Sequence, residues 1–87
     1  MLLKLSQEDN VALALKGAEA GERLPGLDRA VAVDIPAGHK VALADIAEGQ
    51  AIVKYGQIIG FAAGPIRAGE HVHTHNVSLK DFDRDYA

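Results

Sequence analysis

Short apolar runs, separated by polar segments that contain glycine, dominate the pattern of this chain. The runs are rich in Val and Ile and cover residues 11–15, 30–33, 40–43, 51–54, 58–62 and 71–77. Runs of about four to seven residues are typical of strands, because helices need roughly ten or more residues with a 3.6-residue period. Tyr55-Gly56-Gln57, between two of the runs, is predicted to form a hairpin turn. The pattern therefore predicts a mainly β fold built from short strands.

A seven-residue motif with glycine in the fourth position and apolar residues at both ends occurs four times. These glycine-turn motifs cover residues 18–24, 35–41, 46–52 and 66–72. Glycine adopts a positive φ without a Cβ clash, so each motif is predicted to form a tight turn that leads into the next strand. Their uneven spacing argues against a solenoid, which needs a fixed period, and favours one compact domain. Chance recurrence of glycine turns in a small β protein is the alternative interpretation.

The chain is 87 residues long, which suits one domain and is too short for two independent cores. With 48% apolar and 24% charged residues it is expected to fold. We expect one domain over residues 1–87, with a core from about 9 to 77 and a polar tail over 78–87 that is either loose or docks through Phe82 and Tyr86. A small core without disulfides gains from further burial, so a partner is expected, either another polypeptide or a second copy in a homo-oligomer.

The charge pattern and the missing motifs exclude several classes of function. The formal net charge is -3 and the basic residues are scattered singly, so the basic stripe of nucleic-acid binding is absent. The chain has no cysteine, which removes disulfides and thiolate metal sites, and it has neither a Gly-x-Ser-x-Gly nucleophile nor a phosphate loop. The apolar start over residues 1–5 is too short for a signal peptide or a membrane span, so we expect no membrane contact and a cytoplasmic location.

Three of the four histidines fall at alternate positions: His71, His73 and His75. On an extended strand these side chains share one face, and the outer pair is about 13 Å apart at Cα. Two of them, such as His71 and His73, can then bind one divalent metal ion, whereas all three cannot on a straight strand. A face that binds an anion or a substrate, and a solvated strand face without function, are the two alternatives.

Five further residues are candidates for binding. His39 and Lys40 follow a proline turn, and a loop position after a tight turn is a common place for a binding residue. Lys54 and Tyr55 at the predicted hairpin can contact a carboxylate. Asn76 can hydrogen-bond a substrate or cap the end of the strand. For each of them the alternative is a structural role in a solvated turn, in packing or in a cap.

Four segments, in order along the chain, resemble the SAF domain of altronate and galactarate dehydratases. They are Asp9-Asn10-Val11-Ala12, Ile35-Pro36-Ala37-Gly38-His39-Lys40-Val41-Ala42-Leu43, Ile52-Val53-Lys54-Tyr55-Gly56-Gln57-Ile58-Ile59-Gly60 and Ala68-Gly69-Glu70-His71-Val72-His73-Thr74-His75-Asn76. The resemblance covers residues 9–77. It implies a small β-rich SAF fold, akin to antifreeze-like and β-clip domains. In this family the domain lies at the N-terminus of a dehydratase or forms the separate small subunit of split relatives, including sulfolactate sulfo-lyase.

The resemblance also implies a role beside a larger catalytic part that eliminates water from a sugar acid. Such an elimination benefits from a divalent metal (iron, manganese or another) that binds carboxylate and hydroxyl oxygens. The implied metal ligands or general acids are the four histidines, His39, His71, His73 and His75. The implied contacts of the substrate carboxylate are Lys40, Lys54 and Tyr55.

Three functions follow from these observations. The first is a domain or small subunit of a sugar-acid hydro-lyase, inactive alone. The second keeps the larger partner but expels sulfite, as in sulfolactate sulfo-lyase. The third is a free-standing SAF module that binds a carbohydrate or a protein without catalysis, with the histidine row as its recognition face.

Overall fold

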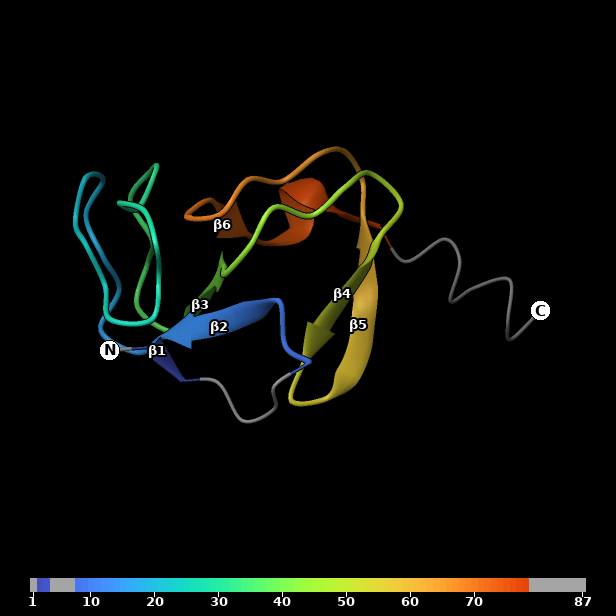
Figure 1. Ribbon diagram of the computed structural model, residues 1–87, viewed down its shortest axis with the longest axis horizontal. Coiled ribbons are helices and arrows are strands. Elements are labelled where there is room, and N and C mark those ends of the chain that lie inside the picture. The colour runs from blue at the N-terminus through green and yellow to red at the C-terminus, as the bar shows by residue number, and fades with distance from the viewer. Residues whose placement is uncertain (1, 4–7, 79–87) are drawn as a thin grey trace.

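The structure, a computed structural model, describes residues 2–3 and 8–78 of the chain (Figure 1). The polar tail expected from residue 78 onward lies, apart from Ser78, outside the described residues, and so do Phe82 and Tyr86. No helix among the described residues is long and apolar enough to cross a membrane.

The described residues form short strands and one turn of 3-10 helix, and they contain no α-helix. The elements are β1 (Leu2–Leu3), β2 (Val11–Ala14), β3 (His39–Ala42), β4 (Ala51–Lys54), β5 (Gln57–Ala62), β6 (His71–Val72), η1 (Thr74–Asn76) and β7 (Val77–Ser78). They make two antiparallel sheets, one in the order β1-β2-β3-β6 and one in the order β4-β5-β7. The prediction of a mainly β domain is confirmed.

Most of the predicted strands match the observed ones to within one residue at each end, but residues 30–33 form no strand. The backbone N–H groups of Val31 and Ala32 donate to carbonyl groups in turns and not to a neighbouring strand. The N–H of Val31 donates to the carbonyl O of Glu22 (2.8 Å), and that of Ala32 donates to the carbonyl O of Gly69 (3.0 Å). The apolar Ala and Val residues of this run therefore reflect burial of Val31 and not strand pairing.

The predicted hairpin is present between β4 and β5. Tyr55 and Gly56 both have positive φ (57° and 75°), and Lys54 pairs with Gln57 across the turn. This is the two-residue loop whose twist matches that of the flanking strands. Gln57, expected in the turn, is the first residue of β5.

All four glycine-turn motifs form the same turn. The glycines Gly21, Gly38, Gly49 and Gly69 have φ of 89°, 80°, 80° and 90°. In each motif the N–H of the fifth residue donates to the carbonyl O of the second, at 2.9–3.0 Å. Positive φ at the third of the four turn residues makes these type II turns, which require glycine there. The first residues of the motifs pair in isolated bridges, Ala18 with Ile35 and Ile46 with Ile66, so the turns are arranged in two couples.

Two clusters of buried apolar side chains make up the core. The first draws on both sheets and consists of Val11, Ala42, Ile46, Ile52, Ala62, Ile66 and Val72, with Ile59 and Val77 packed against it. The second packs the loops between β2 and β3, which form one end of the molecule in Figure 1, and consists of Ala14, Leu24, Leu27, Val31, Ile35, Val41 and Ala68. Val41 and Ala42 are successive residues of β3 in different clusters, so β3 is covered on both faces.

Asp9 and Asn10, just before β2, connect the two sheets. The Asn10 side chain donates from Nδ2 to the carbonyl O of Ala51 (2.9 Å) and accepts at Oδ1 from the N–H of Val53 (2.8 Å), both in β4. Asp9 Oδ1 accepts a hydrogen bond from the N–H of Gly56 (2.7 Å) in the hairpin turn. The opening segment therefore has a structural reason to carry these two polar residues.

Candidate metal and substrate site

Pro36 leaves the side chain of His39 available for a site, because a proline has no backbone N–H that this side chain would have to accept. In the other three glycine-turn motifs the fifth residue is Glu or Gln, and its side-chain oxygen accepts the N–H of the second residue at 2.9–3.0 Å. In the second motif the second residue is Pro36, which has no N–H to donate. The fifth position there needs no acceptor, and it holds His39. The imidazole is consequently available at the first residue of β3.

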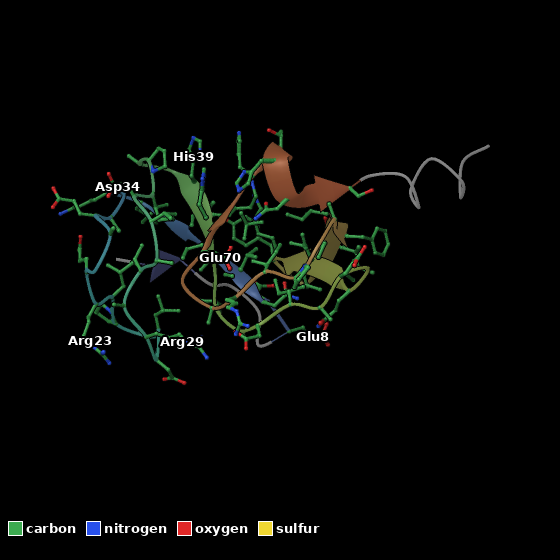
Figure 2. All side chains as sticks on the ribbon, turned by 90° about the horizontal axis from the view of Figure 1, so that it is seen from above. Glu8, Arg23, Arg29, Asp34, His39 and Glu70 are labelled. Carbon is green, nitrogen blue, oxygen red and sulfur yellow. The ribbon has the colours of Figure 1, made fainter. Side chains whose placement is uncertain are left out.

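Pairing of β3 with β6 brings three imidazoles together, and we refer to His39, His71 and His73 as the histidine trio. Val41 pairs with His71, so His39 lies across from the chain that continues β6 toward His73. Nδ1 of His39 and Nε2 of His71 are 2.9 Å apart, and the ring centroids of His39 and His73 are 4.5 Å apart in a stacked arrangement. Figure 2 shows His39 at the end of β3, on the same side of the molecule as η1.

The histidine trio fits a divalent metal ion. One ring nitrogen of each residue lies within 4.8 Å of the other two, and all three residues are half-buried. Metal–nitrogen bonds of about 2.0–2.1 Å at tetrahedral angles place ligand nitrogens about 3.4 Å apart. Small side-chain rotations therefore bring the three nitrogens to ligand positions. A set of three imidazoles suits zinc, iron, nickel or copper and leaves further coordination positions open for a substrate.

The surroundings favour the neutral form of two members of the trio. Desolvation lowers the pKa of His71 below its usual value, and the nearby charges of His39, His75, His73 and Lys40 lower it further. Desolvation also lowers the pKa of His73, followed by the charges of His39, Lys40 and His75. A neutral imidazole has a free lone pair, so both residues can bind a metal at neutral pH without first losing a proton.

The prediction of one extended strand over residues 71–77 is wrong, and with it the straight histidine row. β6 ends at Val72, and the chain turns through η1 before Val77–Ser78 joins the other sheet. The turn brings the ring of His75 to 5.3 Å from that of His71, far closer than an extended strand allows. His75 is exposed and lies outside the trio, whose third member comes from β3.

Asn76 shapes the turn that presents these histidines. Its Oδ1 accepts from the N–H of His73 (3.0 Å), and its Nδ2 donates to the carbonyl O of His71 (2.9 Å). Its own N–H donates to the carbonyl O of His73 (3.0 Å). The side chain is engaged with the backbone at both ends of its amide, as the capping alternative anticipates.

Of the three remaining predicted substrate contacts, Lys40 and Lys54 lie beside the trio, and Tyr55 does not line the same pocket. Lys40 and Lys54 line an open pocket of about 380 Å³ that His73 also lines. Tyr55 is outside the residues that line this pocket. It sits in the hairpin turn, with Nζ of Lys54 4.9 Å from its ring centroid.

Three residues of this pocket were not singled out by the sequence. Ile59, Thr74 and Val77 complete its lining. Thr74 lies between two candidate histidines, and this position is the one sequence signal that points to it. In the sequence, Ile59 and Val77 look like ordinary strand residues. They lie beside Lys40 only because the two sheets meet there.

The chain matches a known family over most of its length. Residues 1–80 match the altronate/galactarate dehydratase SAF domain. The chain is 49% identical over 83 residues to an altronate dehydratase of Bacillus subtilis and 42% identical over 86 residues to that of Escherichia coli, covering 93% and 94% of this chain and 17% of each relative. It is also 42% identical over 76 residues to the (2R)-sulfolactate sulfo-lyase subunit alpha of Chromohalobacter salexigens, covering 78% of this chain and 81% of that subunit.

These matches show how much of each relative the chain corresponds to. The chain spans about a sixth of the length of the two altronate dehydratases and most of the sulfo-lyase subunit. The histidine trio, η1 and the lysines of the pocket all fall within the matched residues 1–80. The chain therefore belongs to the altronate/galactarate dehydratase SAF domain family.

Proposed function

We propose that this chain is the SAF domain or small subunit of a sugar-acid hydro-lyase, and that its histidine trio holds a divalent metal ion beside the substrate. The observation that carries the proposal is that ring nitrogens of His39 in β3, His71 in β6 and His73 just after β6 lie within 4.8 Å of one another. Relatives named as dehydratases and as a sulfo-lyase subunit support the lyase class. The larger catalytic part is the expected partner.

The chemistry of the site follows from its residues. A divalent ion bound at the trio would supply Lewis-acid stabilisation of the negative charge that develops when the proton α to a carboxylate is removed. The three imidazoles would hold that ion where a hydroxyl oxygen and one carboxylate oxygen of the substrate can reach it, which leaves the second carboxylate oxygen for other residues. His75, exposed and 5.3 Å from His71, can hold a proton for the departing hydroxyl as a general acid.

The site on this chain is open to solvent, which is the reason to expect activity only in a complex. All members of the trio are half-buried at the edge of a sheet, and the pocket beside them is open. An elimination through an enediolate needs a site that excludes water. The groups that close the site and remove the α proton are therefore expected on the larger catalytic part.

The test combines this chain with its larger partner, with Mn²⁺ or Fe²⁺ added, and follows dehydration of altronate and galactarate. H39A, H71A and H73A should each lower kcat by about 100-fold or more, and should weaken metal binding to the purified chain. H75A is the matched comparison. It should leave metal affinity unchanged and lower kcat by about 100-fold through loss of the acid. If the larger part dehydrates either acid equally well without this chain, the proposal is wrong.

A second candidate is a sulfolactate sulfo-lyase subunit. It is favoured by the match to the sulfo-lyase subunit alpha, because this chain covers 81% of that short protein. The same metal site would then serve an elimination in which sulfite leaves in place of hydroxide. Release of sulfite from (2R)-sulfolactate by the complex, without dehydration of altronate or galactarate, would assign the chain to this class.

A further inference from the structure

A pocket lies where the two sheets meet, next to the histidine trio. One sheet contributes Lys40 from β3, and the other contributes Lys54 from β4. Ile59 and Val77, which pack against the first core cluster, form apolar walls. His73 and Thr74 complete the lining of this cavity of about 380 Å³. The two apolar walls are anchored to the core, whereas His73 and Thr74 come from the turn at η1.

The two lysines have no counter-charge among the described residues. Neither of them forms an ion pair with a described residue, and the lining of the pocket contains no Asp or Glu. Both are half-buried. Two cations held close together in a partly desolvated pocket are stabilised by an anion bound between them.

The position of the pocket indicates which part of a ligand it takes. His73 belongs both to the trio and to the lining of the pocket. A ligand with its anionic group at the lysines therefore places the adjacent carbons beside the trio. That is the arrangement needed for a hydroxy acid that loses its α proton and the hydroxyl on its β carbon, because both carbons lie within about two bonds of the carboxylate carbon.

The lining also favours a carboxylate over a phosphate. It contains no glycine whose backbone N–H groups would surround a phosphate. Each of the two lysines can donate to one oxygen of a carboxylate. The apolar walls can cover the carbon next to it.

We propose that this pocket binds the carboxylate of a hydroxy acid between Lys40 and Lys54, with Ile59 and Val77 against its carbon chain. The assignment rests on the proposed function for the choice of a hydroxy acid, and it names the residues that orient the substrate toward the trio. Asn76 has no part in this subsite, because its amide is engaged with the backbone.

The experiment titrates the ¹⁵N-labelled 87-residue chain, freed of metal by chelation, with D-gluconate and follows the amide signals by NMR. Sorbitol, the neutral polyol with the same carbon chain, is the comparison for charge. Isethionate is the comparison for a sulfonate. Gluconate should shift the amides of Lys40, Lys54 and Thr74 saturably, and sorbitol should not. K40M and K54M should each weaken gluconate binding about tenfold, the loss expected for one charge-assisted hydrogen bond. K16M, at an exposed lysine outside this pocket, should bind like the unmodified chain.

The outcomes separate this inference from the proposed function. Equal shifts with sorbitol, tighter binding of isethionate than of gluconate, or unchanged affinity in K54M would each overturn the carboxylate subsite. K54M remains decisive if K40M fails to fold, because Lys54 ends its strand beside the turn. Mn²⁺ titration of the same variants reports on the trio alone and should be unaffected by K54M. Binding of Mn²⁺ without binding of gluconate would refute the subsite and leave the metal site standing, whereas the reverse would refute the metal site.

Discussion

At the scale of single residues, the site depends on one proline. Three glycine-turn motifs use a Glu or Gln side chain to satisfy the backbone N–H at the start of the turn. Pro36 removes that N–H, and an imidazole replaces the acceptor side chain without leaving a backbone donor unpaired. The second motif thus differs from the other three at two positions, and this difference leaves an imidazole available to the candidate site.

Gly69 shows how tightly the turn before the site is packed. A Cβ added at this glycine would lie 2.8 Å from the carbonyl O of Ala30, and its φ is 90°. We expect G69A to lower the free energy of unfolding by about 2–4 kcal/mol, because strain in φ adds to a steric clash with the backbone. Urea denaturation followed by circular dichroism measures the change.

Gly49 provides the matched control for this prediction. It has the same turn and a φ of 80°, but a Cβ there would meet no atom within 4 Å. G49A should therefore cost only the conformational part, about 1 kcal/mol. Equal losses in G49A and G69A would show that the contact with Ala30 does not matter.

At the scale of elements, the short 3-10 turn η1 decides where the histidines point. The alternating pattern of residues 71–77 favours a strand, yet the chain leaves the first sheet after Val72 and enters the second at Val77. The Asn76 side chain bonds the backbone of His71 and of His73 and so holds the turn. Under the proposed function its part is to hold His71 and His73 in place, because both ends of its amide are already bonded to the backbone.

We expect N76A to loosen this turn. Loss of two side-chain-to-backbone hydrogen bonds should lower the free energy of unfolding by about 1–3 kcal/mol. Metal affinity should fall about tenfold, because the ligands are no longer held in place by their supporting contacts. Urea denaturation and Mn²⁺ titration measure the two effects.

T74A is the comparison for N76A, since Thr74 is an exposed residue of the same turn. It should change stability by less than about 0.5 kcal/mol and leave Mn²⁺ affinity unaltered. A loss of metal affinity in T74A as large as that in N76A would argue against a specific role of the amide.

At the scale of the whole molecule, the pocket beside the trio forms only because the two sheets are held in one arrangement. The trio belongs to the first sheet and its continuation, and half of the pocket belongs to the second. The apolar cluster shared by the sheets and the contacts of Asn10 with β4 hold them together. The relative placement of Lys40 and Lys54 follows from this contact.

We expect N10A to weaken the whole fold. The change removes two hydrogen bonds and leaves the partly buried N–H of Val53 without its acceptor, which should cost about 2–4 kcal/mol. Thermal unfolding followed by circular dichroism measures the loss. N10D keeps an acceptor for Val53 and loses the donor to Ala51, so it should lie between N10A and the unmodified chain. Stability of N10A equal to that of the unmodified chain would contradict the proposed link between the sheets.

The sequence by itself determined the mainly β fold, four of the strands, the hairpin and the repeated turns. These follow from local chemistry, because apolar runs of strand length and the positive φ of glycine act over a few residues. The resemblance to a family also rests on the sequence alone. The same local rules failed at residues 30–33 and 71–77, where burial and contacts with distant turns outweigh the local pattern.

Only the tertiary structure decided the composition of the site. His39 is separated from His71 by 32 positions in the chain, and their contact arises from the pairing of β3 with β6. The pocket needs Lys40 and Lys54 from different sheets, together with two apolar residues that no sequence pattern distinguishes from core. Long-range pairing depends on how the apolar faces of both sheets are buried together, and alternation along one strand carries no information about the residue that lies across from it.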